Sequence, residues 1–316
     1  MVKTNVPQIV AIQIHNLTRR FGELTAVNGL SLEIYRNEIF GLLGPNGAGK
    51  TTTINMICGL LPVSEGKITF PGNVRKDRRS FIGYCPQENI YYPKLTCLEQ
   101  LLFMGQMYDQ PFQLLKKRAF KLLHLLGLDD KTNVMAGNLS GGMKRRLNIC
   151  LALIHDPEIV ILDEPEAGLD PQSRMLVRDY IRSCKKEKTV ILTTHNMDEA
   201  DRITDRLAII DHGKLLLLDT PQNLKKTMGE GDILEMLTED VSESVLNDFI
   251  EKMKLFPIQL TRNGNILLFT HTDMINRVVE IKKLAEESGL KIEELKFREN
   301  TLEDVFIHLT GRSLRQ

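Results

Sequence analysis

Nine consecutive residues have the types and spacing of a phosphate-binding loop. They are Gly44, Pro45, Asn46, Gly47, Ala48, Gly49, Lys50, Thr51 and Thr52, which fit the pattern G-x-x-x-x-G-K-[ST]. Glycines lack a Cβ atom, so this backbone can wrap closely around an anion and adopt positive φ angles. We expect Lys50 to reach the β- and γ-phosphates of a nucleotide and the Thr51 hydroxyl to bind Mg²⁺. The structural alternative is a glycine-rich turn that only ends a strand.

Two adjacent carboxylates follow an apolar run that is typical of a buried strand. Asp163 and Glu164 come directly after the Ile-Val-Ile-Leu run at 159–162. The carboxyl ends of parallel strands are where α/β sheets place their ligands. We therefore expect Asp163 to hold the magnesium through water and Glu164 to act as general base on the attacking water. Two acids that are merely solvated at a strand end are the alternative.

A second phosphate site is indicated where a serine and two glycines open a helical pattern. Ser140, Gly141 and Gly142 precede an apparent helix over 143–153. Ser140 is a good helix N-cap, so a purely structural role is one interpretation. Successive glycines at the positive end of a helix also leave backbone amides free for a phosphate. Two phosphate sites in one chain, of which this one has no lysine, predict a nucleotide shared between two chains.

The sequence around these motifs predicts an α/β fold that can bring them together. A strand-like run at 39–43 leads into the phosphate loop, and a helix-forming run at 52–59 follows it. Two further apolar, β-branched runs, at 159–162 and 189–192, are separated by a helical segment at 171–185. Continuous apolar strands joined by helical crossovers predict a parallel sheet that is covered on both faces.

Other segments predict additions to that sheet. Short strands with tight turns over 9–43, including one at 32–34, predict a small antiparallel layer. The hydrophobic period becomes helical over 93–128, where Pro111 separates two helices, and this indicates a helical insertion of about residues 88–155. A closing hairpin is expected at 207–218, broken by an Asp-His-Gly turn.

A different unit begins where the sequence becomes polar and glycine-containing, around residues 227–232. We predict two domains, a nucleotide-binding domain over 1–229 and a small α+β accessory domain over 230–316. The pattern of the accessory domain predicts the order βαββαβ with one added helix, which suggests a ferredoxin-like split βαβ fold. Its expected elements are strands at 232–237, 257–260, 266–270 and 291–296, and helices at 241–253, 272–287 and 302–309.

Composition excludes several classes of protein. The 316 residues include 41 basic and 41 acidic side chains, and a formal net charge of zero argues against broad nucleic-acid binding. Five scattered cysteines without C-x-x-C spacing indicate neither a zinc site nor a disulfide framework. We find no signal-peptide pattern and no apolar run near the roughly 20 residues that cross a bilayer. Work at a membrane would therefore require another chain as anchor.

The motifs together resemble those of the nucleotide-binding subunits of ABC transporters, and the resemblance covers residues 9–225. The phosphate loop resembles the Walker A motif of that family. The other matching motifs are the glutamine loop at Gln87, the signature at 139–143, the Walker B motif at 159–164, the D-loop at 167–170 and the switch histidine His195. All six stand in the family's order and spacing.

The resemblance implies roles for residues that would otherwise read as structural. Gln87 would offer its amide oxygen to magnesium and its other end to a mobile loop, and His195 would reach the γ-phosphate. A surface glutamine and a structural histidine are the alternatives. Phe21 matches the aromatic residue of the family's A-loop and would stack on adenine, although a core phenylalanine is the rival interpretation.

Two positions depart from the usual pattern of the family. Met143 stands where many members have glutamine, as is common in the drug-export branch. Glu166 stands where a threonine or serine is usual, so the resemblance does not define its hydrogen bonding. Residues 230–316 resemble the extension of drug-export subunits such as those of daunorubicin-resistance pumps, with the best local match at 301–311.

These resemblances imply an ATPase subunit that dimerises head to tail around two ATP and their Mg²⁺ ions. It would drive transport, with export favoured, through a separate transmembrane permease, and it would be cytoplasmic and peripheral on the inner face of the cell membrane. The ATPase partner would be a second copy or a sister chain, and no nucleic acid is expected. One rival is a soluble ABC ATPase that acts on nucleic acid or ribosomes. A non-hydrolysing nucleotide sensor is another, although it would be expected to lack Glu164 or His195.

Overall fold

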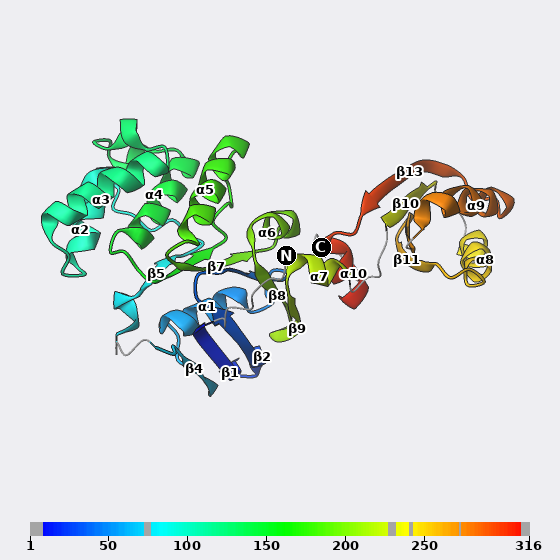
Figure 1. The fold of residues 1–316 in the computed structure, drawn as a ribbon, viewed down its shortest axis with the longest axis horizontal. Coiled ribbons are helices and arrows are strands. Elements are labelled where there is room, and N and C mark those ends of the chain that lie inside the picture. The colour runs from blue at the N-terminus through cyan, green and yellow to red at the C-terminus, as the bar shows by residue number, and fades with distance from the viewer. Residues whose placement is uncertain (1–8, 73–76, 227–231, 240–242, 272, 311–316) are drawn as a thin grey trace, which may run out of the picture. The chain divides into compact units, whose positions relative to one another are not determined.

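The structure is a computed structural model that describes residues 9–72, 77–226, 232–239, 243–271 and 273–310. It divides into two compact units, Met1–Asp219 and Thr220–Gln316, which we describe separately. The predicted domain boundary at residues 229 and 230 lies outside the described residues. The predicted α/β fold class is confirmed, with a parallel sheet, an antiparallel layer and a group of inserted helices in the first unit (Figure 1).

A six-stranded sheet in the order β5-β6-β7-β3-β8-β9 forms the centre of the first unit. Its strands are β3 (Ile39–Leu43), β5 (Ile82–Cys85), β6 (Ile159–Asp163), β7 (Thr189–Thr194), β8 (Arg206–Asp211) and β9 (Lys214–Asp219). Neighbouring strands are parallel except for β9, which forms the expected hairpin with β8. The continuous apolar runs predicted this arrangement, since both faces of β3 and β6 are buried.

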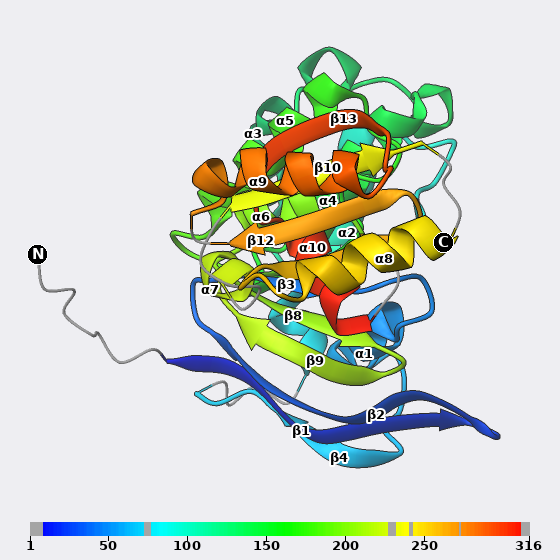
Figure 2. The ribbon, with the colours of Figure 1, turned by 90° about the vertical axis from the view of Figure 1, so that its right-hand side faces the viewer.

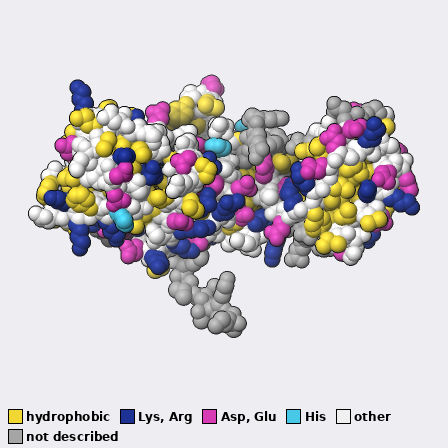
Figure 3. All heavy atoms as spheres, turned by 90° about the horizontal axis from the view of Figure 1, so that it is seen from above, with side chains coloured by type: hydrophobic (Ala, Val, Ile, Leu, Met, Phe, Trp, Pro, Cys, Tyr) yellow, Lys and Arg dark blue, Asp and Glu magenta, His cyan; other side chains and the backbone are white. Residues whose placement is uncertain are grey.

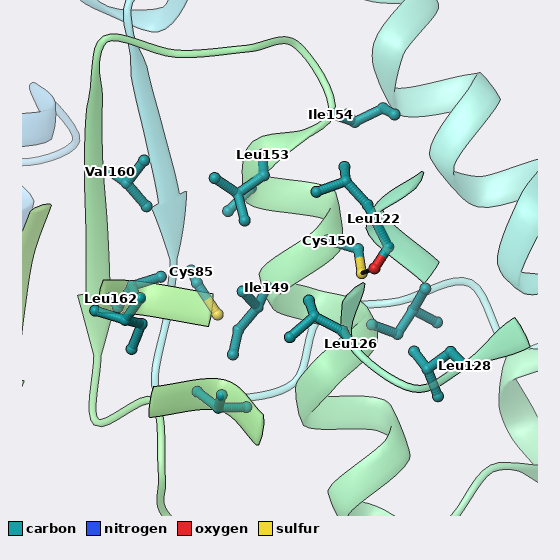
Figure 4. Packing of buried hydrophobic residues seen from close by; sticks show 14 of the residues in the cluster. Cys85, Leu122, Leu126, Leu128, Ile149, Cys150, Leu153, Ile154, Val160 and Leu162 are labelled. Carbon is teal, nitrogen blue, oxygen red and sulfur yellow. Dashed lines mark hydrogen bonds between the residues drawn. The ribbon is translucent and has the colours of Figure 1, made fainter. Parts of the chain in front are cut away.

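Alternate residues of the central strands enter two separate cores. Val160 and Leu162 of β6 pack with the inserted helices, whereas Ile159 and Ile161 pack with the antiparallel layer. Successive side chains of a strand point to opposite faces, so one buried strand supplies both cores. Figure 4 shows the first core, where Val160 faces Leu153 and Leu162 faces Ile149 of the inserted helices.

The inserted helices are α2 (Cys97–Gln106), α3 (Phe112–Leu125) and α4 (Gly141–Leu153). Thr96 and Glu99 form a reciprocal capping box at the start of α2. Pro111 is the residue before α3, which confirms that it separates two helices. The short helices η2 (Asp129–Lys131) and η3 (Ala136–Asn138) lead from α3 to α4.

The antiparallel layer is a three-stranded sheet in the order β2-β1-β4. Its strands are β1 (Val10–Phe21), β2 (Leu24–Tyr35) and β4 (Glu65–Thr69), which lie beside β8, β9 and α1 (Lys50–Cys58) in Figure 2. The prediction of several short strands was wrong here, because β1 and β2 each continue for 12 residues. A register shift between Ile14 and Leu17 places Asn16 at a φ of 47°, so polar residues that suggested turns belong to a bulge.

The remaining helices of the first unit begin at side-chain caps. Asp170 caps α5 (Pro171–Cys184), and Asn196 caps α6 (Met197–Ile203). A further short helix, η1 (Arg78–Ser80), precedes β5. The sequence analysis predicted α5 and missed α6, although Asn196 followed by Glu199 at the third helical position is a capping signal.

The second unit contains a four-stranded antiparallel sheet in the order β11-β12-β10-β13. Its elements are α7 (Pro221–Lys226), β10 (Asp232–Thr238), α8 (Glu243–Met253), β11 (Gln259–Asn263), β12 (Ile266–His271), α9 (Met274–Glu287), β13 (Ile292–Glu299) and α10 (Leu302–Thr310). The order βαββαβ and the final helix are confirmed, whereas α7 was missed. The description of this unit as ferredoxin-like stays a prediction. Across the described ranges, we find no helix long and apolar enough to span a membrane.

Candidate ATP site

The phosphate loop connects β3 to α1, and its backbone needs glycine at both ends. Gly44 has a φ of 156° and Gly49 a φ of 101°. A Cβ atom at Gly44 would lie 2.2 Å from the carbonyl oxygen of Ile210, and one at Gly49 would lie 2.5 Å from that of Ala26. Any larger residue would therefore displace backbone, so the loop is fixed between β8 and β2.

The middle of the loop faces outward. Pro45 is half-buried, Asn46 and Gly47 are exposed, and Ala48 is buried. The Gly213 amide donates a hydrogen bond of 3.0 Å to the carbonyl of Ala48. Thr52 lies half-buried in the first turn of α1. This backbone presents an open turn directly before the positive end of a helix, as anion sites require.

Lys50 is a buried cation that its own loop satisfies with carbonyl groups. It is 6% exposed, and its Nζ donates to the carbonyls of Gly44 at 2.7 Å and Pro45 at 3.0 Å. Burial lowers the pKa of Lys50, and the charges of Glu164 and Asp163 oppose that shift. Among the described residues, none of the ion pairs neutralises this ammonium group. A phosphate in the loop would supply the missing negative charge.

Two of the three predicted metal ligands, Thr51 and Asp163, meet at the end of β6. Thr51 Oγ1 donates a hydrogen bond of 3.0 Å to Asp163 Oδ2, and Thr193 Oγ1 donates to Asp163 Oδ1. A hydroxyl and a carboxylate are oxygen donors of the kind that Mg²⁺ binds. In the described part of the chain, no cluster of three or more His, Cys, Asp and Glu side chains forms a complete metal cage. The residues present therefore fit a magnesium ion that also takes oxygens from phosphate and water.

The three predicted catalytic residues come together beside this pair. Glu164 Oε1 lies 2.9 Å from His195 Nδ1, and Gln87 Nε2 donates to Glu164 Oε2 at 3.4 Å. A carboxylate only accepts, so the ring nitrogen of His195 donates. The Glu164 side chain is 9% exposed and that of His195 57%, which leaves the imidazole as the accessible member. The residues follow β5, β6 and β7, three neighbouring parallel strands.

Glu164 is held in an uncommon backbone conformation. Its φ is 50°, and its amide donates to Thr193 Oγ1 at 3.0 Å and to the Thr193 carbonyl at 3.2 Å. Non-glycine residues adopt positive φ infrequently, and such positions are often functional. Two hydrogen bonds that the Glu164 amide donates to Thr193 of β7 thus hold the backbone from which the carboxylate extends.

Arg145 is a residue of this site that the sequence analysis missed. It is 2% exposed, and its guanidinium donates to the carbonyls of Pro86, Gln87, Asp163, Glu164 and Pro165. One side chain of α4 therefore ties the segment of Gln87 to that of Glu164. The signal in the sequence was its spacing of four from buried Ile149, which places Arg145 on an inward face of α4.

The Ser140 turn is not joined to the phosphate loop. Ser140 Oγ accepts a hydrogen bond of 3.3 Å from the Met143 amide, so its capping role is present. Ser140 and Gly141 are exposed, and a Cβ atom at Gly141 would meet nothing within 4 Å. Among the hydrogen bonds of the described residues, none links these residues to Lys50 or Thr51. The turn is thus open to a partner.

Phe21 lies at the end of β1 and is 45% exposed, so the interpretation as a core phenylalanine was wrong. The Arg19 guanidinium lies over its ring at 4.5 Å from the centroid. Phe21 pairs with Leu24 of β2, and Ala26, two residues further on, contacts Gly49. This end of the antiparallel layer therefore reaches the phosphate loop.

Comparison with known proteins identifies the family. Residues 27–167 match the family model described as ABC transporter. The chain is 36% identical over 314 residues to the linearmycin resistance ATP-binding protein LnrL of Bacillus subtilis (strain 168), which covers 96% of this chain and 99% of that protein. It is 35% identical over 312 residues to the Nod factor export ATP-binding protein I of Ralstonia nicotianae, with 96% and 95% covered.

A solved structure carries the same fold. It is a dimeric ATP-binding cassette in a post-hydrolysis state with bound ADP and Pi, and it matches 66% of this chain and 98% of its own with a TM-score of 0.60 at 25% identity. The chain therefore belongs to the family of ABC transporter ATP-binding proteins, whose members bind and hydrolyse ATP, dimerise and work with a transmembrane permease.

Proposed function

We propose that this chain is the ATP-hydrolysing subunit of an exporter of the drug-export type and that two such chains enclose two ATP molecules. The observation that carries the proposal is the contact of Glu164 with both Gln87 and His195. Three polar side chains from three strand ends meet beside a buried lysine and a Thr51–Asp163 pair. A carboxylate with a purely structural role would not require a glutamine and a histidine partner next to a buried lysine and a hydroxyl–carboxylate pair.

The loop and the strand ends would hold ATP and Mg²⁺ together. Lys50 and the loop amides would bind the phosphates, and Thr51, Asp163 and Gln87 would hold the magnesium, directly or through water. Bound magnesium would neutralise charge on the phosphates and orient them. Phe21 would add stacking to adenine through its exposed ring.

Glu164 would act as general base because its position is fixed and its lone pairs face polar partners. It would accept a proton from the attacking water, a role worth roughly 10² to 10⁴ in rate. His195 would donate a ring N–H to the γ-phosphate, and its contact with Glu164 at 2.9 Å keeps the two side chains together. Arg145 would keep the segments of Gln87 and Glu164 in place through their carbonyls.

A second chain would complete each site through the Ser140 turn. The exposed Ser140 and Gly141 and the half-buried Gly142 offer amides at the start of α4, away from the phosphate loop of the same chain. The related cassette that binds ADP and Pi is a dimer, which supports this arrangement. The partner would be a second copy of this chain or a sister chain.

The permease would contact the helical insertion and the segment after Gln87. Ile90 is 65% exposed and Tyr92 50% exposed, and the Tyr92 ring packs edge-on against Phe103 of α2 at 5.6 Å. Figure 3 shows hydrophobic side chains among basic ones at the end of the first unit that carries the insertion. Apolar surface next to a polar site is typical of a docking surface.

The relatives named for linearmycin resistance and Nod factor export favour export as the direction. We place the chain on the inner face of the cell membrane, held there by its permease, with no nucleic acid as partner. Residues 230–316 would be the accessory domain of the drug-export branch, like that of daunorubicin-resistance subunits. The permease would select the cargo.

The substitution Glu164→Gln tests the proposal. It keeps the shape of the side chain and removes the base, so we expect ATP binding to persist while turnover falls by roughly 10² or more. The stalled chain should form an ATP-dependent dimer on size exclusion. The exposed residue Glu65, changed to Gln in the same way, is the matched control and should behave as wild type. Equal turnover in Glu164→Gln and wild type would remove Glu164 from its role.

A further inference from the structure

A cavity of about 250 Å³ lies behind Glu164, between the segment that follows it and α6. Its lining includes the charged residues Glu164, Glu166, Arg174, His195 and Glu199. Glu166 is one of the two residues that depart from the usual pattern of the family. The cavity therefore joins an atypical carboxylate to the two catalytic side chains.

Glu166 and Glu199 form a buried carboxyl pair in this cavity. Their side chains are 12% and 13% exposed, both line the cavity, and the Arg178 guanidinium lies within 4 Å of each carboxyl. Both oxygens of Glu166 are buried and accept no hydrogen bond from any N–H or O–H group of the described residues. Two ionised carboxylates around one guanidinium repel each other and can only accept hydrogen bonds, so a proton on one of them would relieve the repulsion.

The cations around the pair do not balance two negative charges. Arg178 of α5 donates to Glu199 Oε2, but its Nε lies 3.8 Å from Glu166 Oε1, which is too far for a hydrogen bond. Arg174 of α5 donates to the carbonyl of Leu169 at 3.1 and 3.3 Å. The remaining ionisable groups of the cavity, Glu164 and His195, already bond to one another.

Burial and the neighbouring Glu199 carboxyl raise the pKa of Glu166 to about 7, although Arg178 and Arg174 act in the opposite direction. Glu166 is therefore close to half-protonated near neutral pH. Its ionisation adds a second negative charge in a buried place with one guanidinium in contact. That repulsion pushes the two carboxylates apart.

The pair connects the two segments that carry the catalytic side chains. Glu166 is two residues after Glu164, and Glu199 is four residues after His195 on α6. Resting on the proposed function of Glu164 and His195, we propose that Glu166 and Glu199 share one proton, which holds their segments together and supports hydrolysis. Glu166 is thus a positioning residue that acts through Glu164.

The test compares the pH profile of ATP hydrolysis in wild type, Glu166→Gln and Glu199→Gln. Either glutamine keeps the shape of the side chain, offers an N–H to the remaining carboxylate and removes the titration. A group with a pKa of about 7 is about nine-tenths protonated at pH 6 and one-tenth at pH 8. Relative to the glutamine variants, wild-type kcat should fall about ninefold over that range, with KM for ATP unchanged.

Asp198→Asn is the matched control, because it removes a carboxylate from an exposed position of the same helix. It should keep the wild-type profile. The inference is overturned if both glutamine variants keep the wild-type descending limb, or if wild type has no such limb. A wild type that hydrolyses no ATP at any pH contradicts the proposed function instead.

Thermal unfolding gives a readout that does not need activity. Glu166 binds its proton more tightly in the folded state, so wild-type stability should fall as pH rises from about 4.5 to about 7. The Glu166→Gln variant should lack this part of the slope, and Asp198→Asn should retain it. Identical slopes in wild type and both glutamine variants would overturn the shared proton, whatever the ATPase result.

Discussion

Both units of the molecule bury charged side chains, but they satisfy these charges to different degrees. In the second unit, Arg298 donates to both oxygens of Asp304, at 2.6 and 2.8 Å, and to Glu235 at 3.0 Å. Asp304 also accepts from the amide and the hydroxyl of Thr301. In the first unit, the partners of Lys50 among the described residues are carbonyl groups, and the Glu166 oxygens accept no hydrogen bond from those residues.

The difference separates structural charges from functional ones. A buried charge with a complete set of partners fixes the packing of β13 and α10 and leaves no capacity to bind anything else. A buried charge that is incompletely neutralised costs stability. We expect such a charge where a bound ligand or a proton neutralises it during function. Arg145 belongs to the first unit and yet is saturated by carbonyls, so it joins the segments of Gln87 and Glu164 and has no free N–H group left.

The largest effect is expected from Lys50→Ala. The loss of the cation that faces the phosphates should lower turnover by roughly 10² to 10³ and abolish measurable ATP affinity. Folding should persist, since the lysine forms no ion pair among the described residues. ATPase assays and calorimetry measure these effects, with exposed Lys67→Ala as control. Unchanged ATP binding would contradict the assignment of the loop.

Arg145→Ala tests the distinction between fully partnered and incompletely partnered charges, because it removes a fully hydrogen-bonded guanidinium from the first unit. Its carbonyl partners would lose a charged donor inside a core, so we expect a loss of about 3 kcal/mol in the free energy of unfolding. Turnover should fall as the segments of Gln87 and Glu164 loosen, while ATP affinity changes little. Urea unfolding and steady-state kinetics check both effects, and wild-type kcat in a folded variant would show that Arg145 has no positioning role.

Arg298→Ala should destabilise the second unit and leave the activity of the first unit nearly unchanged. It leaves Asp304, which is 3% exposed, without its guanidinium, and because Arg298 itself is 29% exposed we expect a loss of about 2 kcal/mol. Hydrogen exchange should increase in β10, β13 and α10, while ATP hydrolysis by the isolated chain stays near wild type. Arg277→Ala, which breaks an exposed pair of α9, is the control. A comparable loss of ATPase activity would contradict the structural role.

The smallest effect is a pH dependence of the second unit. Although burial opposes it, the bonds from Arg298 and Thr301 hold the pKa of Asp304 below its ordinary value of 3.8. The resulting stability is present above that value and is lost as pH falls through the lower folded pKa. Acid unfolding followed by circular dichroism should start at lower pH in wild type than in Arg298→Ala. Coincident transitions would show that the pair contributes nothing.

The sequence by itself determined the local parts of this protein. The glycine positions of the phosphate loop depend on the φ angles and close contacts of single residues, and the loop could be read from their spacing. The buried strand before Asp163 and the cap at Ser140 are likewise encoded within a few neighbouring residues. The same holds for the order βαββαβ of the second unit, which follows from hydrophobic periods and turn residues.

Only the tertiary structure decided which distant residues meet. The order β5-β6-β7-β3 brings the segments of Gln87, Glu164 and His195 together, and sequence spacing alone does not encode strand neighbours. The sequence analysis gave Arg145 no role, and it left the hydrogen bonding of Glu166 undefined. Their roles arise from contacts between segments about 20 to 60 residues apart. Such contacts depend on how the chain packs, whereas loops and caps depend on local backbone geometry.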